Sequence, residues 1–116
     1  MTNHHDTTMT LNEYQELAMA TAIFPTDMGV VYPAIGLAGE TGEVAEKVKK
    51  MLRDHAGVLD DKMRHDIALE LGDVMWYVAA MARALNYSLD DVARLNVEKI
   101  NSRQQRHMLH GDGDNR

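Results

Sequence analysis

Four acidic residues have the types and the spacing of a metal site. Glu40 and Glu43 are three residues apart, and so are Glu70 and Asp73. In a helix this spacing places both side chains on one face, about 60° apart around the axis. Oxygen ligands favour hard cations, and Mg2+ is the usual choice when phosphates complete the coordination shell. The pattern therefore predicts a magnesium site to which all four carboxylates contribute.

The surroundings of the two pairs strengthen this interpretation. Each pair supplies the only charges in a mostly apolar or small segment, residues 30–45 and residues 67–82. Carboxylates that face one another in such surroundings repel and lose hydration unless cations or protons compensate them. A solvated acidic edge that includes Glu46 would explain a single pair. Two matching pairs favour the metal site.

A second set of side chains is suited to phosphate. Asn96, Lys99 and Arg103 occupy positions i, i+3 and i+7, which lie on one helix face. We interpret them as a phosphate-binding strip, although a solvated basic face near a helix C-terminus explains the same pattern. The glycine-rich C-terminal end carries Asn115 and Arg116. We hypothesise that it closes over a bound ligand, with one of these two in contact with its phosphate or with another part of it; the alternative is a flexible terminus.

Helices must position these residues, and four segments have helical periodicity. We expect helices at about 11–23, 32–53, 60–86 and 89–107, the third starting at residue 60 or 61. His65 and Asp66 mark a potential break near the start of the third. Short connections between four amphipathic helices predict an all-α, four-helix bundle.

Several residues mark the ends of these helices. Thr10 and Glu13 form a capping-box pattern at the first helix, which Pro25 should end. Pro33 lies in the first turn of the second helix, where its missing N–H does no harm. Ser88 is the expected N-cap of the fourth helix.

Four glycines lie inside the second and third helices: Gly36, Gly39, Gly42 and Gly72. Each costs roughly 1 kcal/mol relative to Ala in a helix interior. We expect the close approach of a neighbouring helix or of a ligand to explain them.

Length and composition bound the rest. The 116 residues suffice for one domain over residues 1–116, with flexible tails expected at 1–9 and 108–116. The absence of cysteine excludes disulfides and thiolate chemistry, and a net charge of -6 argues against nucleic-acid partners. No apolar run is long enough to cross a bilayer and the N-terminus does not resemble a signal peptide, so we expect a cytoplasmic protein without a membrane partner. The almost uniformly apolar third helix predicts an oligomer.

Three segments resemble the MazG-like nucleotide pyrophosphohydrolases of the all-α nucleoside triphosphate pyrophosphatase superfamily. Residues 36–47 (GLAGETGEVAEK) are similar to the family's ExxE segment, and residues 70–77 (ELGDVMWY) to its ExxD segment. Residues 96–103 (NVEKINSR) are similar to the Asn/Lys/Arg segment that follows. The resemblance covers the chain from about residue 11 to the C-terminus.

This resemblance implies an enzyme that hydrolyses a nucleoside triphosphate to its monophosphate and pyrophosphate. It implies a catalytic metal site of Glu40, Glu43, Glu70 and Asp73, with Mg2+ as the cofactor and Mn2+ as a substitute. The implied assembly is a homodimer or homotetramer. Lys99 and Arg103 would neutralise the leaving pyrophosphate. Which base and sugar are preferred stays open, because Tyr14, Tyr32, Trp76 and Tyr77 are as suited to the core as to stacking on a base.

Three other interpretations compete with this one. A ferritin-like di-iron bundle also gathers helical carboxylates, but characteristically with Glu-x-x-His pairs that Glu43 and Glu70 lack. His65-Asp66 is a weak signal of an HD-type metal phosphohydrolase. A non-catalytic oligomerisation module would retain the fold without the activity.

Overall fold

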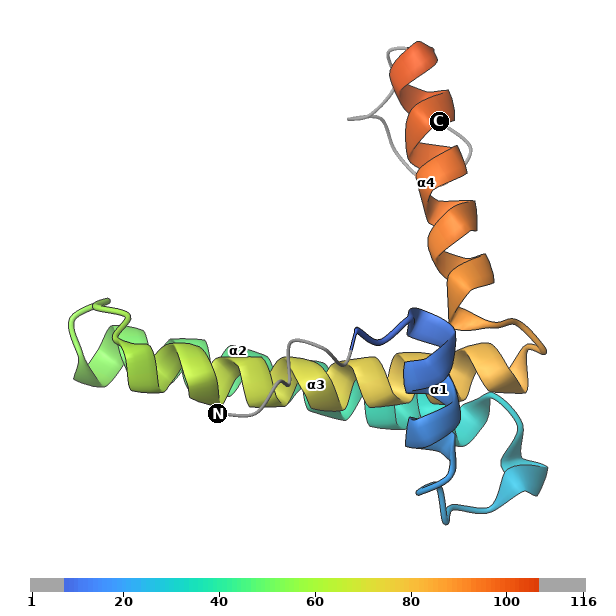
Figure 1. Ribbon diagram of the computed structural model, residues 1–116. Coiled ribbons are helices and arrows are strands. Elements are labelled where there is room, and N and C mark those ends of the chain that lie inside the picture. The colour runs from blue at the N-terminus through green and yellow to red at the C-terminus, as the bar shows by residue number, and fades with distance from the viewer. Residues whose placement is uncertain (1–7, 107–116) are drawn as a thin grey trace.

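A computed structural model describes residues 8–106, and all regular secondary structure in this range is helical. The elements are α1 (Leu11–Met19), a 3-10 turn η2 (Thr26–Met28), α2 (Val31–Asp54), α3 (Asp61–Ala84) and α4 (Leu89–Gln105). The predicted all-α fold with four helices is confirmed. The helices α2 and α3 form a long antiparallel hairpin, α1 crosses α3, and α4 projects from the hairpin at a steep angle (Figure 1). The carboxylate pairs therefore lie on the two helices that pack together most extensively.

Local hydrogen bonds explain where α1 begins and ends. The capping box is present, since Glu13 N donates to Thr10 Oγ1 at 3.0 Å and Thr10 N donates to Glu13 Oε1 at 2.8 Å. The predicted end near Ile23 is wrong, because α1 stops at Met19. The Thr21 hydroxyl donates to Ala18 O at 2.6 Å, and such a side-chain bond competes with the next helical turn.

The other three helices follow their predicted ranges closely. The helix α3 runs without a break through His65 and Asp66. Its N-cap is Asp60, which accepts a hydrogen bond from Met63 N at 2.8 Å. It ends two residues early because Asn86 adopts a positive φ of 63°, which no α-helix continues. The predicted tails lie outside the described residues except for residues 8 and 9, which have no regular structure.

One side chain of α1 fixes the corner between α3 and α4. Gln15 Nε2 donates to Ala79 O and to Tyr87 O, both at 3.2 Å, and Gln15 Oε1 accepts from Leu89 N at 3.1 Å. These bonds tie the side chain to α3, to the connecting loop and to the first N–H of α4, which has no partner within its own helix. The direction in which α4 leaves the hairpin is therefore set by α1.

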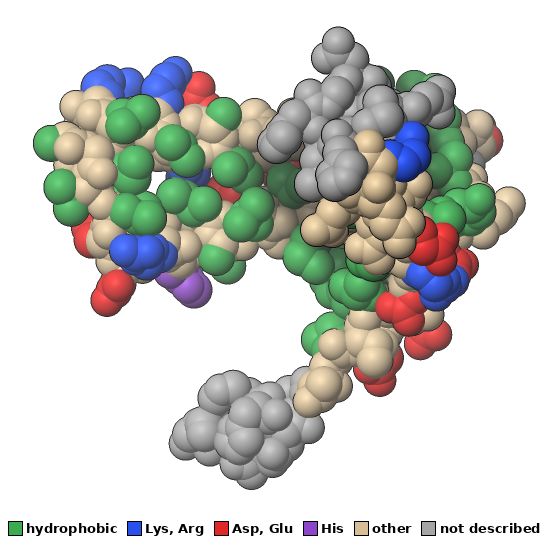
Figure 2. Space-filling model, turned by 90° about the horizontal axis from the view of Figure 1, so that it is seen from above, with side chains coloured by type: hydrophobic (Ala, Val, Ile, Leu, Met, Phe, Trp, Pro, Cys, Tyr) green, Lys and Arg blue, Asp and Glu red, His purple; other side chains and the backbone are tan. Residues whose placement is uncertain are grey.

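The buried core of the described residues is small. Its apolar members are mostly alanines: Ala18, Ala79, Ala80, Ala82 and Leu89. Many larger apolar side chains are exposed instead, including Ile35 at 68%, Leu69 at 58% and Leu95 at 49%. Figure 2 shows green side chains spread over the hairpin. A single chain thus leaves much apolar surface uncovered, although none of the described helices has the combined length and apolar character for crossing a membrane.

The interhelical approach predicted for the glycines occurs at only one of them. A Cβ added to Gly36 would overlap the ring of Tyr77 on α3, so glycine is required there. Nothing in the described chain lies within 4 Å of the corresponding positions at Gly39, Gly42 and Gly72. Packing between helices of one chain therefore does not explain these three.

The Gly36 contact predicts a measurable cost of substitution. Gly36→Ala should lower the free energy of unfolding by up to about 2 kcal/mol, because overpacking costs roughly 1–3 kcal/mol and better helix propensity offsets about 1 kcal/mol. Denaturant unfolding followed by circular dichroism measures the change. Gly39→Ala is the matched control and should be neutral or stabilising. An equal loss in both variants would contradict the role of Tyr77.

Candidate metal centre

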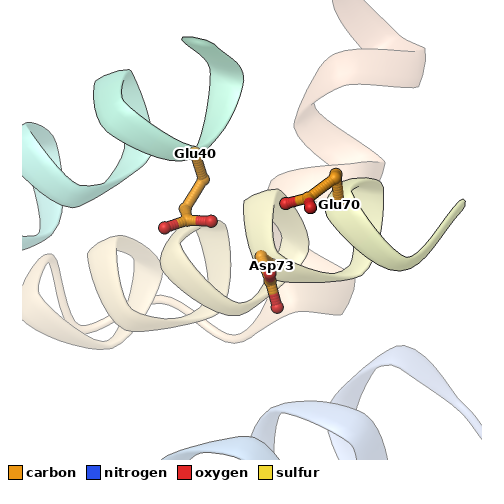
Figure 3. A group of neighbouring side chains, drawn as sticks. All are labelled: Glu40, Glu70 and Asp73. Carbon is orange, nitrogen blue, oxygen red and sulfur yellow. The ribbon is translucent and has the colours of Figure 1, made fainter. Parts of the chain in front are cut away.

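Three of the four predicted carboxylates meet between α2 and α3. Glu40 extends from α2, and Glu70 and Asp73 extend from α3 (Figure 3). Each offers one oxygen, and these oxygens all lie within 4.8 Å of one another. Glu40 and Glu70 are half-buried and Asp73 is exposed, so the group is open to solvent on one side. Such a cluster of carboxylate oxygens has the ligand type that Mg2+ and Mn2+ prefer.

Glu43 lies outside this group. It is exposed on α2, while Glu40, three residues earlier, faces α3. A step of three residues turns the side chain about 60° around the helix, enough to move it from the helix contact toward solvent. Glu43 still adds to the negative field at Glu40.

The electrostatics of the group favour a bound cation. Burial raises the pKa of Glu40 above its ordinary value of 4.5, and the negative charges of Asp73, Glu70 and Glu43 raise it further. A hydrogen bond with Asp73 acts in the same direction. A divalent cation would remove this repulsion, and so the chemistry of the group fits the predicted metal.

Lys47 is a site residue that the pattern of carboxylates did not identify. Its Nζ lies 3.8 Å from Glu70 Oε2, which makes it the nearest described cation to the group. Seven residues separate Glu40 from Lys47, about two helical turns, so the two share the α2 face that meets α3. This spacing is the sequence feature that could have identified Lys47 as a neighbour of the carboxylates.

An aromatic wall borders the carboxylates on the opposite side from Lys47. Trp76 and Tyr77, with ring centroids 5.0 Å apart, line a cavity of about 370 Å³ together with Glu40 and Asp73. Trp76 Nε1 donates to Thr21 Oγ1 at 3.0 Å, which fixes the indole. The pKa of Tyr77 is raised, mainly by burial. The cavity combines aromatic and acidic groups beside the metal centre.

The other two aromatic candidates lie at the edges of this region. Tyr32 stacks on Phe24 with a centroid distance of 4.6 Å, and Phe24 contacts Trp76 at 6.0 Å. The pKa of Tyr14 on α1 is raised by burial and by the charge of Asp73.

The predicted phosphate-binding strip is not at the metal centre of its own chain. Asn96 and Lys99 line a separate cavity of about 690 Å³ in the corner between α3 and α4. Arg103 is buried, with 6% exposure, and so does not belong to a solvated basic face. All three lie on the projecting helix α4 (Figure 1). Asn115 and Arg116 lie outside the described residues, so their contact with phosphate or base stays a prediction.

The His65-Asp66 signal has another explanation. Asp66 accepts a hydrogen bond from Lys62 Nζ at 2.8 Å, one helical turn away. Neither residue belongs to a group of potential metal ligands within residues 8–106. Asp66 is thus part of an ion pair along α3.

The sequence of the chain is similar to sequences of known proteins. The sequence model of the MazG nucleotide pyrophosphohydrolase domain matches residues 34–108. The "Gene 37 protein" of Mycobacterium phage L5 is 46% identical over 114 residues, which cover 93% of this chain and 100% of the phage protein. The name of that protein states no activity. No solved structure matches the chain.

The raised pKa of Glu40 predicts a pH-dependent stability of the metal-free protein. The folded state binds this proton more tightly than the unfolded state, so the resulting stability is present below pH 4.5 and is lost as the pH rises through the shifted value. Glu40→Gln should therefore raise the melting temperature in chelator at pH 7, and this gain should shrink toward pH 4. Thermal melts over this range measure it. A gain independent of pH would contradict the assigned cause.

Proposed function

Because the chain belongs to the MazG nucleotide pyrophosphohydrolase family, we propose that it hydrolyses a nucleoside or deoxynucleoside triphosphate to the monophosphate and pyrophosphate. The observation that carries the proposal is the group formed by Glu40, Glu70 and Asp73 beside an aromatic cavity. Nucleotide-pool control is the corresponding cellular role. The substrate also supports a cytoplasmic location.

Mg2+ is the proposed cofactor, with Mn2+ as a substitute, held by Glu40, Glu70 and Asp73. When bound, it would supply charge neutralisation and polarisation of the phosphates. Glu43 completes the proposed catalytic set. Because it is exposed beside the group rather than within it, its carboxylate has room to accept the proton of an attacking water.

The aromatic cavity is proposed to receive the nucleoside. Trp76 and Tyr77 offer ring surfaces next to the carboxylates, and Thr21 holds the indole in place. Trp76 is the single tryptophan of the chain. Its fluorescence therefore reports on ligands at this cavity alone.

The phosphate-binding strip is proposed to act between subunits. Asn96, Lys99 and Arg103 lie on α4, which projects from the hairpin that carries the carboxylates. A second copy would bring its α4 to the hairpin and cover exposed side chains such as Ile35 and Leu69. The proposed assembly is a homodimer or homotetramer. The net charge of -6 gives nucleic acid no part in it.

The proposed reaction predicts loss of turnover with the metal or a ligand charge. A panel of nucleotides with Mg2+, read by product chromatography, should yield monophosphate and pyrophosphate, and excess chelator should abolish both. Asp73→Asn should lower the rate more than about 100-fold, since even outer-shell changes cost 10–100-fold. Glu43→Gln should also abolish turnover.

The matched control is Glu46→Gln. This carboxylate lies on α2 but is exposed and paired with Lys49 at 2.9 Å. It should retain the unsubstituted rate. Full turnover in chelator, or in Asp73→Asn, would refute the proposed site.

The proposed assembly predicts a stable oligomer at micromolar concentration. Light scattering should give the mass of a dimer or tetramer of the 13.0 kDa chain. Ile35→Glu should dissociate it. Position 35 is 68% exposed in the single chain, so a carboxylate there is hydrated in the monomer but would lose this hydration in a dry interface. Asn101→Glu, at an exposed polar position of α4, should leave the mass unchanged. A monomeric unsubstituted chain would be contrary to the proposal.

A further inference from the structure

The contact between α2 and α3 changes chemical character along its length. At one end lie Trp76 and Tyr77, and the carboxylates follow. Next comes Lys47, whose Nζ is 3.8 Å from Glu70 Oε2. This distance exceeds that of a hydrogen bond, so the ammonium lies within ion-pair distance of Glu70 without a hydrogen bond to it.

Beyond Lys47, a cavity of about 300 Å³ opens between the two helices. It is lined by Lys47, Lys50, Met51, His55, Asp60, Lys62, Met63 and Asp66. Its two carboxylates are already engaged, because Asp60 caps α3 and Asp66 pairs with Lys62. Lys47, Lys50 and His55 supply the remaining polar lining. The cavity therefore favours an anion over a cation.

The net charge of this end of the hairpin also favours an anion. Residues 47–64 carry six Lys and Arg against three Asp, a local charge of +3 in a chain of net charge -6. Figure 2 shows blue side chains along both edges of this part of the hairpin, with red side chains beside them. The carboxylates would repel an anion bound at this end unless a cation lies between the anion and the carboxylates.

We propose that the cavity beside Lys47 binds the pyrophosphate end of the nucleotide, with Lys47 as its principal ligand and Lys50 as a second cation. The inference rests on the proposed function. The order along the helix contact, aromatic cavity then carboxylates then lysines, matches the order of nucleoside, metal-bridged phosphate and terminal phosphates in the substrate. In this arrangement the leaving pyrophosphate is bound by a cation of the same chain that holds the carboxylates, so the cations of α4 are not needed for it.

Lys47 is close enough to the carboxylates to serve this purpose. One ammonium both lies 3.8 Å from Glu70 Oε2 and lines the cavity. A phosphate oxygen bound to it at an ordinary hydrogen-bond distance of about 2.8 Å is then less than about 7 Å from a metal ligand. Neighbouring phosphates of one chain can span that separation.

Binding of pyrophosphate to the full-length chain tests the inference. In calorimetry with Mg2+, Lys47→Met should weaken pyrophosphate binding at least tenfold without weakening the binding of Mg2+ or of a nucleoside monophosphate. The monophosphate affinity is read from Trp76 fluorescence. Lys47→Arg should restore most of the pyrophosphate affinity. Lys49→Met is the matched control, since Lys49 pairs with Glu46 and does not line the cavity.

Each contrary result has a distinct meaning. Unchanged pyrophosphate affinity in Lys47→Met, or no binding to the unsubstituted chain, would overturn the subsite. An equal loss of Mg2+, monophosphate and pyrophosphate affinity would also overturn it, because Lys47 would then act through Glu70. If Lys47→Met selectively loses pyrophosphate but the unsubstituted chain hydrolyses no nucleotide, the subsite stands and the proposed function fails.

Discussion

Like charges held together between two packed helices are the constraint on which the rest of this structure depends. Three carboxylates share one region, and the pKa of Glu40 is raised there by burial and by the negative charges of Asp73 and Glu70. The hairpin holds them there because packing on either side, such as Gly36 against Tyr77, fixes the register of α2 on α3. The repulsion lowers the stability of the metal-free fold. A bound cation would relieve this repulsion, which would add to the affinity of the site for the cation.

The same constraint explains why the surroundings of the group are so uneven. Because carboxylates occupy part of the contact between α2 and α3, fewer apolar side chains can be buried there. The buried core of the described chain consists mainly of alanines near the corner of α1, α3 and α4. Larger apolar residues such as Ile35 and Leu69 point outward instead. The open space at Gly39, Gly42 and Gly72 lies beside the acidic residues. Within the described part of the chain, this space leaves room for a ligand or a second copy beside the carboxylates.

Local sequence rules predicted the helices and drew attention to the three carboxylates that meet between α2 and α3, since both depend on periodicity. Capping residues such as Thr10 and Ser88 mark helix starts through short-range hydrogen bonds. The end of α1 was misplaced because Thr21 bonds back to Ala18 and receives the indole N–H of Trp76, a contact between residues 55 positions apart. Periodicity alone also could not separate Glu40 from Glu43. Which of the two faces α3 depends on the rotation of α2 about its axis, which tertiary packing sets.

The placement of α4 was beyond any local rule. Its direction depends on the three hydrogen bonds of Gln15, a residue 64 to 74 positions away from its partners. The predicted phosphate-binding cations lie on α4, which leaves the hairpin, whereas Lys47 lies 3.8 Å from Glu70 across the helix contact itself. In the proposed assembly, the cations of α4 would act on the carboxylates of a second copy. Lys47, in contrast, is in place as soon as α2 and α3 pack.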